Sequence, residues 1–195
     1  MASELSSTAA SIVASARSLL ATRGYNGFSY ADIAETVGIS KPSIHHHFPG
    51  KAALVRRVVA DYRAEAQAGM EGLRQQVSDP VARLQAWTDF WQACLRDGTL
   101  PFCICALLAT EMPAIPDEVA AVVRGHFDDL SGWLAGLLDE GARAGQFRLH
   151  GAAPAEALSF MASIHGAMIS ARAYRDPELF AAISTALVGR LTAPH

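Results

Sequence analysis

The hydrophobic positions of this chain recur at helical spacing along most of its length. Ile12, Ala16 and Leu19, for example, follow the i, i+4, i+7 pattern of an amphipathic helix. Breaks such as Asp79-Pro80 and Asp97-Gly98 separate the helical segments. Together they predict nine helices, over about 7–24, 30–37, 41–48, 51–77, 81–96, 102–111, 117–144, 154–174 and 177–191. Because the chain is rich in alanine and has few clusters of β-branched residues, we expect an all-α fold.

Two of the predicted helices are short and are joined by a tight turn. Ser29 precedes the first of them and Asp32 follows three residues later, which is the spacing of a capping box. Gly38 ends this helix, Ser40 is placed to cap the next one, and Pro42 lies in its first turn. Two short helices with glycine at the start of their connecting turn predict a helix-turn-helix.

Charge is divided unevenly along the chain. The formal net charge of −3 does not suggest a nucleic-acid binder, but residues 1–60 carry six lysines and arginines against three acidic residues. Residues 61–195 carry ten arginines against sixteen acidic residues. This asymmetry is expected where only the N-terminal part meets phosphate groups. We therefore predict a helix-turn-helix DNA-binding domain over residues 1–49 and a larger helical body over residues 50–195.

The segment Ser40–Lys51 reads SKPSIHHHFPGK and contains the only two lysines of the chain, with three histidines between them. A short, locally cationic helix after a glycine turn is suited to lie on DNA. The histidine run could also suggest a metal site. Consecutive helical residues, however, point about 100° apart, so His45, His46 and His47 do not converge on one ion. We predict no metal and no cofactor.

Composition also limits location and chemistry. Met1 to Ser11 lack the basic start of a signal peptide, and no apolar run of about 18 residues is present, so we expect a cytoplasmic protein that does not bind a membrane. The three cysteines are too few for a disulfide framework and fit a reducing compartment. An enzyme would require Cys94 or Cys103 to act with a histidine as a catalytic pair, but no nucleophile motif or metal-ligand spacing supports this. We predict no enzyme activity.

From Ala16 to Val58 the sequence resembles the TetR/AcrR family of transcriptional regulators. The segment RGYNGFSYADIAETVGISKPSIHHHFPGKAALV fills nearly every position of the family's helix-turn-helix pattern. One departure is His45, where the family usually has tyrosine. The resemblance implies a three-helix DNA-binding head and a body, residues 50–195, that binds a ligand and forms a dimer.

The resemblance also assigns roles to residues of the head. A recognition helix places its first residues against base edges, while flanking groups bind phosphate. Lys41 would then reach guanine O6 and N7, and Lys51 would bind phosphate. Ser29 would act first as a helix cap. The predicted DNA-binding residues are Ser29, Tyr30, Lys41, Pro42, Ser43, His45, His46, His47 and Lys51.

In the body, the resemblance implies an effector pocket and a dimer surface. An apolar, aromatic pocket with a few polar groups is the usual small-molecule site, and small residues on the last two helices permit close approach of a second copy. The pocket candidates are Trp87, Phe90, Trp91, Cys94, Cys103, Leu107, Phe127, Met161, His165 and Met168. The dimer candidates are Ala162, Gly166, Ser170, Phe180, Ile183 and Leu187. Packing within a single chain is the alternative explanation for each of these residues.

The sequence thus predicts a dimeric repressor that a small molecule releases from a pseudo-palindromic operator in double-stranded DNA. Two alternatives remain. The first is a repressor that senses electrophiles or oxidants through Cys103, which would require a lowered thiol pKa. The second is a protein-interaction adaptor that does not bind DNA, and failure to bind any fragment of its own upstream region would support it.

Overall fold

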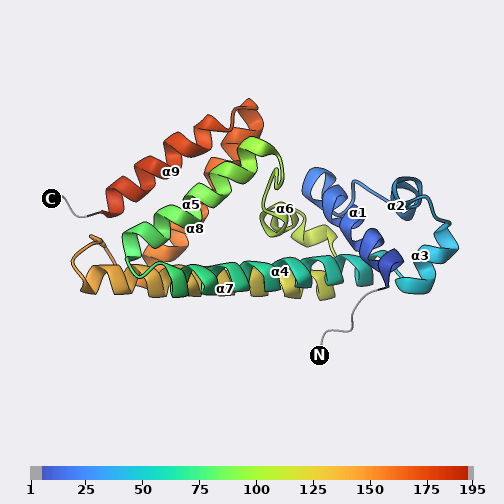
Figure 1. The fold of residues 1–195 in the computed structure, drawn as a ribbon, viewed down its shortest axis with the longest axis horizontal. Coiled ribbons are helices and arrows are strands. Elements are labelled where there is room, and N and C mark those ends of the chain that lie inside the picture. The colour runs from blue at the N-terminus through green and yellow to red at the C-terminus, as the bar shows by residue number, and fades with distance from the viewer. Residues whose placement is uncertain (1–5, 193–195) are drawn as a thin grey trace. The chain divides into compact units, whose positions relative to one another are not determined.

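The computed structural model describes residues 6–192, and this part of the chain folds into nine α-helices and one 3-10 helix (Figure 1). The elements are α1 (Ser7–Arg23), α2 (Tyr30–Val37), α3 (Lys41–His47), α4 (Lys51–Gln76), α5 (Pro80–Asp97), α6 (Ile104–Thr110), η1 (Met112–Ala114), α7 (Asp117–Arg143), α8 (Ala153–Tyr174) and α9 (Glu178–Leu191). The predicted all-α fold is confirmed. Within the described residues, no helix is long and apolar enough to cross a membrane.

Local capping signals determine several helix ends. Asp79 accepts the Ala82 N–H at 2.7 Å at the start of α5, where Pro80 occupies the first turn. Gly98 ends the same helix with φ 73°, a left-handed conformation that favours glycine. At α6 the prediction was two residues early, because Cys103 has an extended backbone and acts as the N-cap.

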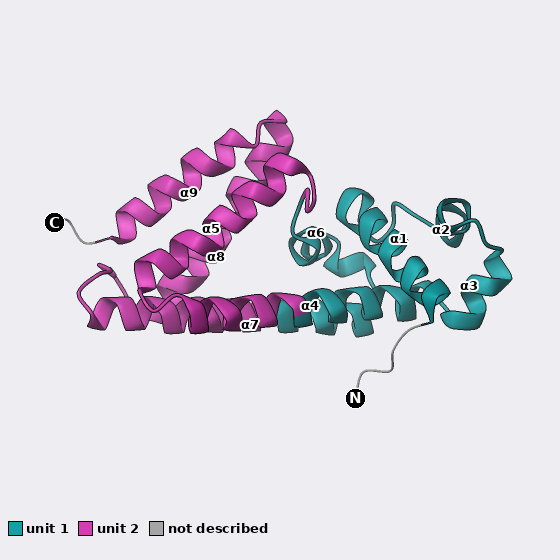
Figure 2. Ribbon diagram, viewed as in Figure 1, with its two compact units in different colours: residues 1–64, 102–126 teal, residues 65–101, 127–195 magenta. Residues whose placement is uncertain are grey.

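The described helices belong to two compact units (Figure 2). One unit contains the described residues up to 64 together with 102–126, and the other contains 65–101 together with the described residues from 127 onwards. Both α4 and α7 therefore contribute residues to each unit. The head predicted over residues 1–49 shares its unit with α6. The domain boundary predicted near residue 50 stays a prediction. Residues 1–5 of the predicted head and residues 193–195 of the predicted body lie outside the described residues.

The core of the first unit holds the three head helices together. α1 contacts both α2 and α3, and α2 contacts α3. Ile12 and Leu20 of α1, Ile33 of α2 and Ile44 of α3 are fully buried. Burial of each such side chain contributes about 1.5–3 kcal/mol, so this core fixes the orientation of α3 relative to α1.

The core of the second unit combines α5, α8 and α9. α9 packs against both α8 and α5 (Figure 1). Phe180 and Ile164 are fully buried there. The buried Arg83 guanidinium is also accommodated, because it forms an ion pair with Glu140 at 2.8 Å and donates to the Val77 carbonyl at 2.9 Å.

Candidate nucleic-acid interface

A tight turn between α2 and α3 sets the angle of the helix-turn-helix. Gly38 adopts φ 73° and its N–H donates to the Ala34 carbonyl, as does the N–H of Ile39 at 3.1 Å. Ser40 then caps α3, accepting the Ser43 N–H at 3.3 Å through its hydroxyl oxygen. Each of these features is the one that the sequence predicted for a helix-turn-helix.

One face of α3 is open to solvent. Ile44 is fully buried and Phe48 nearly so, and together they attach the opposite face to the core. The predicted DNA-binding residues of this helix lie away from that core: Lys41, Pro42, His45 and His46 are exposed, and Ser43 and His47 are partly exposed. The structure therefore brings these six predicted residues together on a single short helix.

His45 is held in place by contacts at the end of α3. Its Nδ1 lies 3.4 Å from the Pro49 carbonyl oxygen, and its ring packs edge-on against Tyr30 with centroids 4.8 Å apart. A carbonyl only accepts, so Nδ1 carries the hydrogen when this bond forms. The other ring nitrogen, Nε2, is then an acceptor in neutral imidazole and a donor once the ring is protonated.

Tyr30 is not available to phosphate, which corrects the sequence prediction. Its hydroxyl donates to the Phe48 carbonyl at 3.1 Å, and only 9% of the residue is exposed. Burial, and to a smaller extent the nearby Tyr25, raises the pKa of Tyr30 to about 12. Tyr30 therefore belongs to the core that links α2 to the end of α3.

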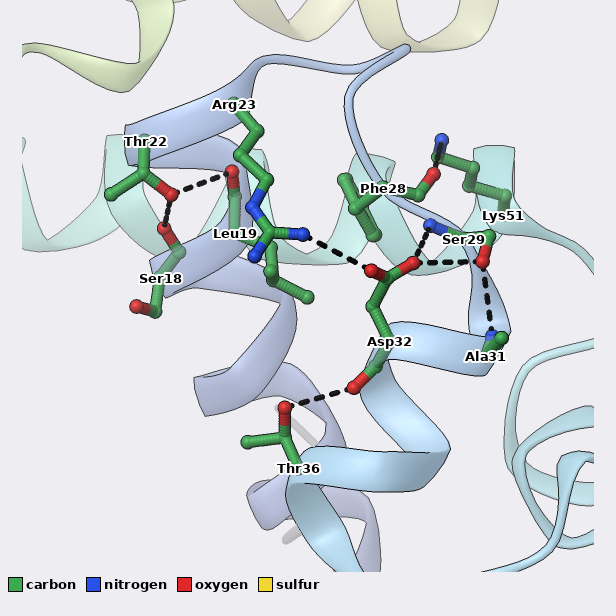
Figure 3. Close-up of polar contacts among 10 residues, drawn as sticks. All are labelled: Ser18, Leu19, Thr22, Arg23, Phe28, Ser29, Ala31, Asp32, Thr36 and Lys51. Carbon is green, nitrogen blue, oxygen red and sulfur yellow. Dashed lines mark hydrogen bonds and ion pairs between the residues drawn. The ribbon is translucent and has the colours of Figure 1, made fainter.

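Ser29 starts α2 as the cap that the sequence predicted (Figure 3). Its hydroxyl oxygen accepts the Ala31 N–H at 3.2 Å. The Asp32 carboxylate in turn accepts both the N–H and the hydroxyl of Ser29, each at 2.8 Å, and the guanidinium of Arg23 at 3.0 Å. The two hydrogen bonds from Ser29 are the main reason why the pKa of Asp32 is lowered.

Replacing Ser29 by alanine should lower the free energy of unfolding by about 1 kcal/mol, because the substitution removes a helix cap. Urea denaturation of the DNA-free protein measures this loss. Ser18→Ala is the matched control, since Ser18 is exposed inside α1 and alanine favours a helix interior. Equal stability of the two variants would contradict the capping role.

Lys51 holds the turn that precedes α2, a role that sequence analysis missed (Figure 3). Its ammonium donates to the Phe28 carbonyl and lies over the rings of Phe28 and Tyr25, 4.2 and 4.7 Å from their centroids. Burial lowers the pKa of Lys51, and the carboxylates of Glu111 and Asp32 oppose that effect. Its predicted phosphate contact stays a prediction, and Lys51→Ala would disturb the turn as well.

The pocket candidates do not all belong to one unit. Cys103 and Leu107 are in the first unit, and the other eight candidates are in the second. In the second unit, Trp87 lies 6.0 Å from Trp133 and 6.5 Å from Phe160, measured between ring centroids. Phe90 was predicted to line the pocket, but 51% of this residue is exposed on the surface of α5.

His165 is the polar candidate among these aromatic residues. Its ring packs edge-on against Phe127, with centroids 5.3 Å apart. Burial lowers the pKa of His165 to about 4, so the imidazole is neutral at physiological pH. A neutral imidazole offers one donor and one acceptor to a bound molecule.

Cys103 is enclosed in the first unit. It is 1% exposed, its sulfur accepts the Tyr62 hydroxyl at 3.5 Å, and it lies 3.9 Å from His126 Nε2. Burial raises the pKa of the Cys103 thiol by more than the Tyr62 hydrogen bond lowers it. A buried, protonated thiol is a poor nucleophile, and its surroundings do not meet the requirement of the thiol-sensing alternative.

The candidate dimer residues differ in how much surface they offer. Ala162 and Gly166 are exposed on α8, and Ser170, Ile183 and Leu187 are partly exposed. Phe180 is fully buried inside its own chain, so it does not offer surface to a second copy, and its prediction as a dimer residue is corrected. Periodicity identified an apolar face of α9 but did not distinguish the side that packs against α8 and α5 from the side that faces outward.

Comparison with known proteins agrees with this architecture. The family model for bacterial regulatory proteins of the tetR family matches residues 12–58, and the model for the tetracyclin repressor-like C-terminal domain matches residues 80–187. A search of curated proteins found no match. A TetR-family transcriptional regulator from Agrobacterium tumefaciens is 49% identical, with a TM-score of 0.94, and the match covers 96% of this chain and 98% of that one.

More distant solved structures share the fold alone. The reduced form of E. coli NemR is 19% identical with a TM-score of 0.83, and the match covers 97% of this chain and 99% of that one. A regulator from Saccharomonospora viridis in complex with choline is 20% identical with a TM-score of 0.82, and the match covers 97% of this chain and 100% of that one. Both family models and the 49% identical relative lead to one conclusion: this chain belongs to the TetR family of DNA-binding transcriptional regulators.

Proposed function

We propose that the protein is a dimeric repressor that binds a pseudo-palindromic operator and leaves it when a small molecule binds the body. The observation that carries this proposal is the solvent-exposed face of α3, on which Lys41, Pro42, His45 and His46 lie. In the proposed complex, the first turn of α3 contacts base edges in the major groove. Its target is chromosomal DNA, so its action is cytoplasmic, and no catalysis is involved.

A second copy of the chain is needed to read a palindrome. Leu158 and Ile169 of α8 are each 53% exposed, on the same helix as the exposed Ala162 and Gly166. Large apolar side chains beside small residues favour close packing of another helix. We therefore place the dimer surface on α8 and on the outward side of α9.

Selection of bound duplexes from a random DNA pool tests the proposal directly. The purified protein should enrich an inverted repeat whose half-sites are about one helical turn apart. Affinity should fall steeply with salt, because phosphate contacts release counterions. Enrichment of no sequence at all would instead support the adaptor alternative.

The effector is proposed to bind among the aromatic side chains of the second unit. Trp87, Trp133 and Phe127 provide ring surfaces there, and His165 provides a neutral hydrogen-bonding group. The choline complex of the Saccharomonospora viridis regulator is one case of a small molecule bound to this fold. We favour this mode over thiol sensing because Cys103 is buried and its pKa is raised.

Replacing both His45 and His46 by asparagine should weaken operator binding, because two exposed imidazoles are then lost from the proposed DNA-binding face. Fluorescence anisotropy with a labelled operator measures the affinity at constant ionic strength. Unchanged operator affinity in this double variant would remove the two histidines from the proposed interface.

A further inference from the structure

The turn between α1 and α2, residues 24–28, is held by side chains from outside the three head helices. We call these five residues the head turn. Lys51 of α4 donates to its Phe28 carbonyl. Glu111, which directly follows α6, accepts the Tyr25 N–H at 2.6 Å through Oε2 and the Asn26 N–H at 3.4 Å through Oε1. The positively charged Lys51 and the negatively charged Glu111 thus both bind the backbone of the head turn.

The chain at Gly24 is shaped for the close approach of this carboxylate. Gly24 has φ 73° and ψ −173°, a conformation that is essentially restricted to glycine. A Cβ atom at this position would lie 2.6 Å from Glu111 Oε2, well inside van der Waals contact. The carboxylate can therefore reach the two N–H groups only because residue 24 has no side chain.

Both ends of this contact are attached to rigid structure. Ile104 and Leu108 of α6 are fully buried, and the Glu111 N–H donates to the Leu108 carbonyl at 3.0 Å, so α6 fixes the backbone of Glu111. Phe28 is 5% exposed at the other end of the head turn, and Ser29 caps α2 immediately afterwards. A displacement of Glu111 would therefore move the start of α2, and with it α3.

From this geometry we infer that Glu111 is a positioning residue for operator recognition. Its two charge-assisted hydrogen bonds fix the head turn and so set the placement of α2 and α3 for DNA. Operator affinity then depends on the position of Glu111 at the end of α6. The inference rests on the proposed operator binding and names a residue on which that binding depends.

The test compares Glu111→Ala and Glu111→Gln with Glu118→Gln in the full chain. Glu118 is an exposed carboxylate of the same unit that forms an ion pair with Arg56 at 3.5 Å, so Glu118→Gln controls for the loss of one negative charge. Operator affinity is compared with affinity for random duplex DNA, and the preferred half-site spacing is determined by selection. Amide hydrogen exchange at Tyr25 and Asn26 reports on the head turn itself.

We expect Glu111→Ala to reduce the ratio of operator to random-DNA affinity about tenfold, as loss of a charge-assisted hydrogen bond would. It should also broaden the spacing preference and accelerate exchange at Tyr25. Glu111→Gln should lie between Glu111→Ala and the wild type, because its amide oxygen still accepts one N–H. Glu118→Gln should leave the ratio, the spacing and the exchange unchanged.

The inference is overturned if Glu111→Ala and Glu111→Gln lower thermal stability but keep the wild-type affinity ratio and spacing, since the contact would then be structural only. If Glu111→Ala does not fold, Glu111→Gln decides in the same way, because glutamine has the same shape as glutamate. A wild-type protein that selects no operator would count against the proposed function. A wild-type protein that selects an operator, with both Glu111 variants binding that operator equally well, would refute this inference alone.

Discussion

Replacement of Gly166 by glutamate should make the protein monomeric and weaken operator binding by at least about a hundredfold, because the two heads would no longer bind as one unit. Gly166 is exposed on α8, and a Cβ atom at this position would meet nothing within 4 Å in its own chain. In a two-fold dimer the substitution occurs in both copies of the surface. A buried carboxylate without a partner is strongly unfavourable in such an interface.

Gly69→Glu is the matched control for this prediction. Gly69 is an exposed residue of α4 whose added Cβ would also meet nothing within 4 Å, so the control introduces the same charge at a helical glycine. Sedimentation velocity measures the oligomeric state, and circular dichroism confirms that both variants are folded. A Gly166→Glu protein that remains a dimer would place the interface elsewhere.

Local sequence signals were enough to predict the helix-turn-helix. Ser29 and Asp32 form their capping box within one helical turn, and Gly38 ends α2 by its own backbone conformation. Such hydrogen bonds join residues that are close in sequence, so their geometry follows from a few neighbouring positions. The same holds for the exposed face of α3, because its apolar residue Ile44 marks the buried side.

Contacts between residues that are far apart in sequence were missed, because neighbouring positions do not reveal them. Tyr30 at the start of α2 looked available to phosphate, but its hydroxyl reaches the carbonyl of Phe48, 18 positions away. Lys51 reaches back 23 positions to Phe28, and Glu111 reaches back 86 positions to Tyr25. Helical periodicity describes which face of a helix is apolar, but it does not identify the partner of a single polar group.

The body shows the same limit for apolar residues. Phe180 and Phe90 both fitted a helical pattern, yet Phe180 is fully buried and Phe90 is 51% exposed. A helix that packs against several neighbours carries apolar residues on more than one side. Core, pocket and dimer surface therefore give similar sequence patterns, and only the tertiary arrangement separates them.

Replacement of Lys41 by alanine should weaken binding to the selected operator by about thirtyfold or more. Lys41 is exposed in the first turn of α3, where a side chain of its length can reach guanine in the major groove. A specific base contact contributes about 1–3 kcal/mol, and a dimer makes this contact once in each half-site. A loss of about 2 kcal/mol corresponds to about thirtyfold in affinity.

The base preference at one position distinguishes a base contact from a phosphate contact. If Lys41 reads a base, repeated selection with Lys41→Ala should lose the preference at one symmetric pair of operator positions and retain the others. If it binds phosphate, affinity should fall equally for all sequences and the salt dependence should decrease by about one counterion per half-site. Arg143→Ala is the control, because Arg143 forms an exposed ion pair with Asp139 on α7, so the variant removes one positive charge away from α3. Unchanged operator affinity in Lys41→Ala would remove this lysine from the interface and leave recognition to His45 and its neighbours on the same face.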